Sequence, residues 1–223
     1  MLVMASEGIV SWGARFLDAL DSEGHVKPDR RRDVAVALAA YATNDGRGRG
    51  LGDPVHEAIT EGRRKANEER RRHGSPEVPY YSCCDLGHWL LSCLGCTDEA
   101  VVNRTDDGGH VPWLVSVNFS RLRGAKAFRL ARGVVAQPGD ILLIDHAGGH
   151  AAVVRSWDAA TGVVVTENYG GPYAHRKVQQ ATPDGRGGWL LDGSPLIGWV
   201  DLEAVPLDGP ARLPEVVAEA VDG

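Results

Sequence analysis

Apolar residues recur three or four positions apart in the first part of the chain, which is the spacing of helices with one buried face. Such runs at residues 9–20 and 34–41 predict two helices, and the second should end at Asn44-Asp45-Gly46, where Asn and Gly tolerate the left-handed conformation of a helix end. A third helix should begin at Asp53-Pro54, with Asp53 as its N-cap and Pro54 as its first helical residue.

From Phe128 onwards the pattern changes to short runs rich in Val and Ile, separated by Gly, Pro and Asp. Runs of this kind are typical of strands in an antiparallel sheet. The runs are DILLI, HAAVVRSW, GVVVTEN, RKVQQ and LIGWV. Because the helices come first and the strands follow, the chain predicts an α+β fold in which N-terminal helices pack on a C-terminal antiparallel β-sheet.

Composition narrows the classes of protein and partner. The chain has 223 residues, 43% of them hydrophobic, which is enough for one large core, and its net charge of −6 gives no basic field for nucleic acid or an anionic membrane. The basic residues of GRRKANEERRRH alternate with Glu68 and Glu69, so we expect a solvated helix face there.

The N-terminus has no basic leader followed by a long apolar run, and no stretch approaches the roughly 18 apolar residues that span a bilayer. We therefore expect a soluble protein made in the cytoplasm, which would reach a cell wall only by release or delivery. We expect neither nucleic acid nor a membrane as its main partner, and the sequence does not predict an oligomeric state.

All four cysteines lie between Cys83 and Cys96, too few and too clustered for a disulfide scaffold. A zinc site is an alternative, since Cys84, His88, Cys93 and Cys96 are soft ligands and the last two have CxxC spacing. On a helix, however, Cys93 falls nearly opposite Cys84, and no second separated pair completes the site. We therefore expect no metal and no cofactor.

The third interpretation is that one of these cysteines is a catalytic nucleophile. Cys83 and Cys84 stand where a polar segment gives way to the apolar pattern of a fourth helix, expected from about Cys84 to Leu94. The unpaired N–H groups and the partial positive charge of a helix N-terminus favour a thiolate, which is the nucleophilic form of cysteine. A histidine from elsewhere in the fold should then act as its general base.

His150 is the histidine best placed for that role, because it opens the strand HAAVV directly after a turn. If Trp157 pairs with Val163 across the next turn, Asn168 becomes a diagonal neighbour of His150 on the same sheet face and can orient the imidazole. A register shift of one residue would bring Glu167 there instead, so both remain candidates. On periodicity alone, an ordinary hairpin with polar ends explains this segment equally well.

Taken in order, several short motifs resemble those of papain-like amidases and peptidases of the NlpC and CHAP type. They are Cys83-Cys84-Asp85-Leu86, Pro138-Gly139-Asp140, Gly149-His150, Glu167-Asn168-Tyr169 and Ile197-Gly198-Trp199-Val200-Asp201. The resemblance covers about residues 78–206 and implies a papain-like fold. It also implies Cys83 as nucleophile, His150 as base and Asn168 or Glu167 as the orienting group.

The resemblance further implies a cysteine hydrolase that cleaves an amide or peptide bond through a thioacyl intermediate, with a peptide or amide substrate such as a peptidoglycan stem peptide. Tyr81 is a candidate donor to the oxyanion. The segment 1–77 resembles nothing recognised and is expected to be a helical extension, and 207–223 an acidic tail. An acyl transferase, a non-catalytic module of the same fold and a zinc-stabilised interaction module are the alternatives.

Overall fold

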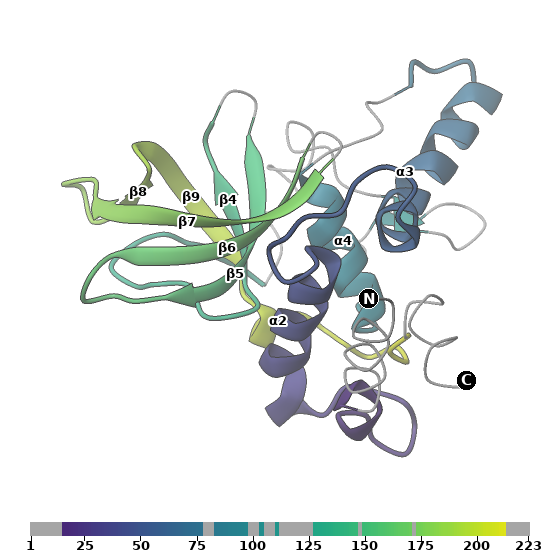
Figure 1. Cartoon of the computed structure of the whole chain (residues 1–223), viewed down its shortest axis with the longest axis horizontal. Helices are drawn as coiled ribbons and strands as arrows, with labels where there is room; N and C mark the ends of the chain where they lie inside the picture. The colour runs from purple at the N-terminus through teal and green to yellow at the C-terminus, as the bar shows by residue number, and fades with distance from the viewer. Residues whose placement is uncertain are drawn as a thin grey trace.

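The computed structural model describes residues 15–77, 83–97, 103–104, 110–111, 127–146, 149–170 and 173–212 (Figure 1). The helical elements are η1 (Pro28–Arg30), α2 (Arg31–Ala42), α3 (Pro54–Arg72), α4 (Cys84–Cys93) and η2 (Leu202–Ala204). The strands are β1 (Asn103–Arg104), β2 (His110–Val111), β3 (Phe128–Leu130), β4 (Ile141–Ile144), β5 (His150–Trp157), β6 (Val163–Gly170), β7 (Tyr173–Pro183), β8 (Trp189–Leu191) and β9 (Ser194–Val200).

The predicted helix ends are confirmed where the structure describes them. Helix α2 stops at Ala42, and Asn44, Asp45 and Gly46 follow it with positive φ angles. Asp53 caps α3, since its carboxylate accepts a hydrogen bond of 2.8 Å from the Val55 N–H. Of the first predicted helix, residues 15–18 are helical, and the part before them lies outside the described residues.

The five predicted strands are confirmed as β4, β5, β6, β7 and β9, but the predicted fold class is wrong. The strands follow the order β3-β9-β4-β5-β6-β7-β8, and β8 also pairs with β9. The sheet therefore closes on itself as an antiparallel six-stranded β-barrel accompanied by a few helices, with β3 as an added strand on β9. This is not the papain-like arrangement of helices packed on a sheet that the motifs implied.

The closure depends on two features at the far end of the barrel. Strand β7 runs on past its pairing with β6 and pairs with β8 at residues 181–183. The chain then reverses at Asp192-Gly193, where both residues have positive φ angles, as a two-residue hairpin turn requires. This turn returns β9 alongside β8, and β9 continues beside β4.

The sheet has a separate apolar core on each of its faces. One core lies inside the barrel and includes Leu142, Ile144, Val154, Val164, Leu191 and Trp199. The other lies between the barrel and the helices, where alternate residues of the same strands pack against α2, α3 and α4. The helices on the right of Figure 1 therefore share a core with the outer face of β4, β5 and β6.

A glycine allows α4 to lie close to the barrel. A Cβ atom at Gly87 would come within 3.1 Å of Ile141 Cδ1 and 3.2 Å of Ile141 Cγ2. Both residues are buried. This close approach sets the distance between the start of α4 and the strands.

We expect Gly87→Val to lower the free energy of unfolding by about 1–3 kcal/mol, because its side chain would overpack this contact. Urea denaturation measures the change. Gly170→Val is the matched control, since a Cβ atom there meets no heavy atom within 4 Å. An equal loss in both variants would contradict the packing explanation.

Candidate active site

Cys83 is the N-cap residue of α4, and the side chain of this residue is half-buried. Because α4 packs against β5, Cys83 lies beside the start of that strand, and its Sγ is 3.9 Å from the carbonyl oxygen of Gly149. The thiol therefore stands at the helix N-terminus, where backbone N–H groups favour an anion.

His150 is the first residue of β5 and pairs with Ile144 of β4. It therefore shares the sheet face of Ile144, which is the face that lines the barrel. Its Nε2 lies 2.8 Å from Asn168 Oδ1 on β6. The structure thus brings Cys83, His150 and Asn168 together at one end of the barrel.

A β-bulge decides which residue of β6 reaches His150. Trp157 pairs with Val164, one residue away from the expected Val163, so the hairpin itself is shifted. The register changes between Val154 and Ser156, and beyond this bulge Ala152 pairs with Asn168. The bulge cancels the shift and leaves Asn168 on the face of His150.

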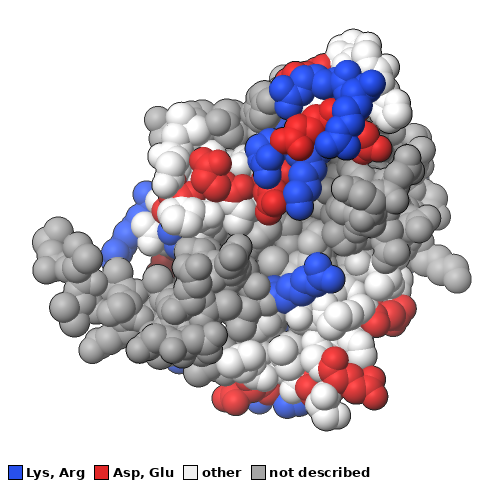
Figure 2. Space-filling model, turned by 90° about the vertical axis from the view of Figure 1, so that its right-hand side faces the viewer, with Lys and Arg blue, Asp and Glu red and all other residues white. Residues whose placement is uncertain are grey.

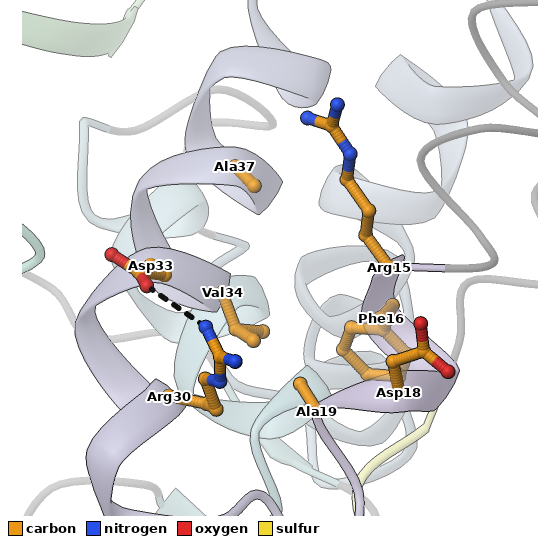
Figure 3. Close-up of a pocket in the computed structure, with 8 residues that line it drawn as sticks. All are labelled: Arg15, Phe16, Asp18, Ala19, Arg30, Asp33, Val34 and Ala37. Atoms are coloured by element: carbon orange, nitrogen blue, oxygen red, sulfur yellow. Dashed lines mark ion pairs between the residues drawn. The ribbon is translucent and has the colours of Figure 1, made fainter.

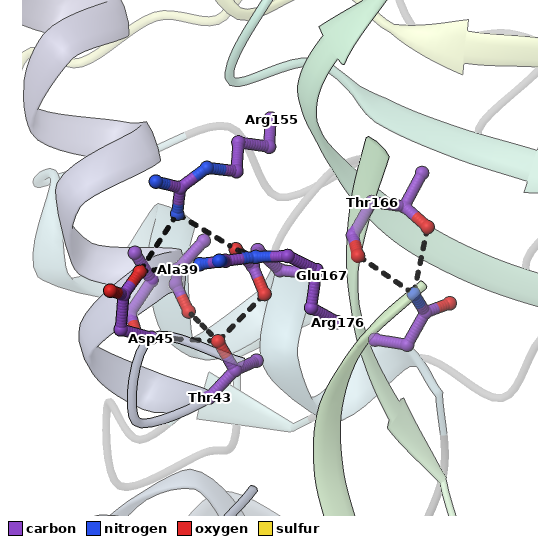
Figure 4. Close-up of polar contacts among 9 residues, drawn as sticks. Ala39, Thr43, Asp45, Arg155, Thr166, Glu167 and Arg176 are labelled. Carbon is purple, nitrogen blue, oxygen red and sulfur yellow. Dashed lines mark hydrogen bonds and ion pairs between the residues drawn. The ribbon is translucent and has the colours of Figure 1, made fainter. Parts of the chain in front are cut away.

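Glu167 lies on the opposite face of β6 and is fully buried. Its carboxylate accepts hydrogen bonds from Thr43 at 2.7 Å, from Arg176 at 2.8 Å and from Arg155 at 3.2 Å (Figure 4). Asp45 bonds the same two arginines, which ties the end of α2 to the barrel. The structure therefore places Glu167 in a structural contact and Asn168 beside the imidazole.

The amide of Asn168 is held in one orientation. Its Nδ2 donates to Thr166 Oγ1 at 2.8 Å and to the Thr166 carbonyl at 3.1 Å, as the pair of dashed lines beside Thr166 in Figure 4 shows. The Thr166 hydroxyl in turn donates to Gln179 Oε1 at 2.9 Å. Asn168 therefore presents its oxygen to the ring, so His150 carries a proton on Nε2 and has Nδ1 left for Cys83.

The electrostatics favour a thiolate at Cys83. A hydrogen bond from the Cys84 thiol, together with hydrogen bonds and charge from His150, lowers the pKa of Cys83 to about 4 although burial opposes the shift. Burial lowers the pKa of His150, but the bonds with Cys83 and Asn168 and the charge of the thiolate outweigh it and raise the pKa overall. A lowered pKa on the thiol and a raised pKa on the imidazole both favour the ionic form, a thiolate beside an imidazolium.

The other three cysteines are buried, and none of the four forms a disulfide. The bond with Cys83 and burial raise the pKa of Cys84, and burial raises the pKa of Cys93 to about 12. Within the described ranges, no three His, Cys, Asp or Glu side chains come close enough together to hold a metal ion.

A buried ion pair fixes the helix that carries Cys83. Arg63 of α3 binds both carboxylate oxygens of Asp85, with contacts of 2.6, 2.9 and 3.1 Å, and both side chains are about 1% exposed or less. The expectation of a solvated face along this part of α3 is therefore wrong at Arg63. Basic and acidic side chains are mixed on the exposed surface shown in Figure 2. On the exposed side of α3, Arg64 pairs with Glu68 and Lys65 pairs with Glu61.

Tyr81, the candidate oxyanion donor, lies outside the described residues. A pocket of about 370 Å³ lies between residues 15–19 and the start of α2, lined by Arg15, Phe16 and Val34 among others (Figure 3). None of Cys83, His150 and Asn168 lines it.

The orientation of Asn168 gives a prediction that NMR can check. We expect the wild type to show a hydrogen-bonded His150 Nε2–H proton, and Thr166→Val to weaken or lose that signal because the Asn168 amide is no longer held. Thr166→Ser keeps the hydroxyl and should keep the signal. The same Nε2–H resonance in Thr166→Val and wild type would contradict the role of Thr166.

Comparison of the chain with protein-family models, with curated proteins and with solved structures finds no match. No helix in the described part of the chain is long and apolar enough to cross a bilayer.

Proposed function

We propose that this protein is a cysteine hydrolase that cleaves an amide or peptide bond through a thioacyl intermediate. The observation that carries the proposal is the oriented set of Cys83, His150 and Asn168, in which Asn168 holds Nε2 of the ring and leaves Nδ1 for the thiol. A nucleophile, a base and a group that orients the base are the parts that covalent acyl transfer requires.

In the first step, the Cys83 thiolate attacks the carbonyl carbon of the amide. The tetrahedral intermediate then collapses, the C–N bond breaks, and His150 gives its Nδ1 proton to the leaving amine. A thioester between Cys83 and the acyl group remains. In the second step, Nδ1 accepts a proton from water as the water attacks the thioester, and the thiolate leaves as the carboxylic acid forms.

The start of α4 also supplies a place for the oxyanion. Backbone N–H groups in the first turn of a helix have no partner within the helix, and they point toward the N-cap residue, here Cys83. Each donor aimed at the developing negative charge is worth roughly 3 kcal/mol of transition-state stabilisation. We assign one donor to the Cys83 N–H, and Tyr81 stays a candidate for another.

Activity against a panel of short peptide amides and peptidoglycan stem peptides, followed by mass spectrometry, tests the proposal. We expect the wild type to release an amine and to carry an acyl group on Cys83 after acid quenching. His150→Gln should lose at least about 100-fold in rate, since general acid–base catalysis contributes that much. Cys83→Ser should lose at least about 100-fold as well, because a serine hydroxyl stays protonated at neutral pH and is a weak nucleophile. Cys96→Ala, which changes a buried cysteine of the core, should keep its activity.

The same assay separates the alternatives. Addition of glycinamide as an acceptor amine reveals an acyl transferase if the acyl group passes to the amine in preference to water. Equal product formation by Cys83→Ser and wild type would contradict the proposal. Stoichiometric bound zinc with unreactive cysteines would instead support an interaction module.

A further inference from the structure

We propose that Lys177 and His175 of β7 form a binding subsite for a carboxylate on the leaving-group side of the proposed active site. The enzyme would then act on amides whose leaving amine is an amino acid with a free carboxylate, such as the C-terminal residue of a peptide. This inference rests on the proposed function.

Strand register places both residues on the face of the sheet that carries the imidazole. Asn168 pairs with His175, and Thr166 pairs with Lys177, so each pair projects its side chains to the same side. Asn168 bonds His150 on that side. Strand β8 pairs with β7 only at residues 181–183, and Arg49 bridges to Ala174 at the start of β7. Between these points no described strand pairs with the outer edge of β7 at residues 175–179, where Lys177 is exposed and His175 partly exposed.

Both basic side chains are available to a ligand. The side chains of Lys177 and His175 make no hydrogen bond and no ion pair with any residue that the structure describes. The basic residue between them, Arg176, points to the other face and binds Glu167 and Asp45. The register therefore divides β7 into a structural arginine on one face and two unpaired basic groups on the other.

Two acidic side chains close to β7 are already engaged. Glu167 faces away from the site and is neutralised by Arg155 and Arg176. Asp192 accepts hydrogen bonds from the Gln179 side chain at 3.2 Å and from the Gln180 N–H at 2.9 Å. Burial lowers the pKa of His150 and the charge of Lys177 lowers it further, although the net shift is upward, so the lysine is near enough to act on the site.

The order of the groups identifies the side of the substrate. Cys83 lies by the start of β5, Asn168 is on the next strand, and Lys177 and His175 are on the strand beyond it. Neighbouring strands are about 4.8 Å apart, so β7 lies roughly 10 Å from β5. The register sets His175 opposite Asn168 and Lys177 two residues further along β7. The leaving amine takes its proton from His150 and therefore extends over Asn168 toward β7. A carboxylate on that amine is within reach of the long lysine side chain.

Two alkylating reagents test this subsite without knowledge of the substrate. N-(bromoacetyl)glycine carries a carboxylate beyond its reactive carbon, and N-(bromoacetyl)glycinamide is its neutral counterpart. The rate at which each reagent alkylates Cys83 is measured at pH 6. It is divided by the rate at which the same reagent alkylates N-acetylcysteine, which corrects for the reactivity of the reagent itself. We expect wild type to favour the anionic reagent by about fivefold or more at low salt, and 0.5 M NaCl to reduce the preference.

Lys177→Met should reduce that preference at least about threefold, because the charge interaction with the anionic reagent is lost. The rate with the neutral reagent is the internal reference for any change in the reactivity of the thiol itself. Lys65→Met removes an exposed lysine of α3 and should change neither rate. The same preference in Lys177→Met and wild type, or no preference in wild type, would overturn the subsite. If neither reagent alkylates Cys83 at pH 6, the proposed function fails as well.

Discussion

His150→Gln is expected to make Cys83 alkylation strongly dependent on pH between 5.5 and 8. In the wild type, hydrogen bonds from Cys84 and His150 and the charge of the imidazolium lower the pKa of Cys83 to about 4, so the thiolate is present throughout this range. Glutamine has no positive charge, so the variant loses the part of the shift that the imidazolium supplies, while the hydrogen bond from Cys84 remains. The pKa should therefore rise part of the way toward the usual value near 8.5. The rate with iodoacetamide should then increase at least about tenfold from pH 5.5 to 8.

The test compares the alkylation rates of one variant at two pH values. Absolute rates of different variants cannot be compared directly, because a thiolate of higher pKa is also a stronger nucleophile. His146→Gln is the matched control, since His146 is exposed and bonds Ser194 at the other end of the β4–β5 turn. It should keep the flat profile. A flat profile in His150→Gln would show that the imidazole does not activate the thiol.

Arg63→Met is expected to lower the free energy of unfolding by about 3–5 kcal/mol. The Asp85 carboxylate is completely buried, and Arg63 is the cation that binds both of its oxygens. Removal of the guanidinium takes the positive charge away from a fully buried carboxylate, which raises the cost of keeping that carboxylate ionised. Urea denaturation monitored by circular dichroism measures the loss.

Two further variants separate this effect from a general effect of charge. Arg64→Met removes the neighbouring exposed arginine, whose pair with Glu68 is on the surface, and should cost less than about 0.5 kcal/mol. The double variant Arg63→Met with Asp85→Leu removes both charges and should recover most of the lost stability. Equal losses in Arg63→Met and Arg64→Met would contradict the account of the buried pair.

The local elements could be predicted because their signals are local. The Asp53-Pro54 start of α3 depends on a cap and a fixed φ angle, and the stop after α2 depends on residues that tolerate positive φ. Strands β4 to β7 and β9 were visible as apolar runs. Each of these signals acts within one turn or one strand.

The closure of the barrel could not be predicted in the same way, because the apolar pattern of a strand does not indicate which other strands it pairs with. The sequence does contain one signal that bears on this closure. Asp192-Gly193 is a strong hairpin signal, and it predicts that the segments on either side of it pair as β8 and β9 do. The pairing of β9 with β4 joins residues far apart in sequence and has no local signature.

The candidate site depended on register in a way that only the structure settles. The expected hairpin register was wrong by one residue at Trp157, and the bulge between Val154 and Ser156 compensates for it before His150 is reached. Nothing in the sequence marks that bulge. Arg63 was missed for a similar reason, since only the packing of α3 on α4 separates one buried arginine from its exposed neighbours.

The pH profile of iodoacetamide alkylation in the wild-type protein, with peptide mapping to identify the labelled cysteine, tests the central claim most directly. If Cys83 is a thiolate held beside His150, label should appear on Cys83 alone, and its rate should level off above about pH 5, since its pKa is about 4. Label on Cys83 that increases with each pH unit up to 8, or equal label on all four cysteines, would contradict the claim.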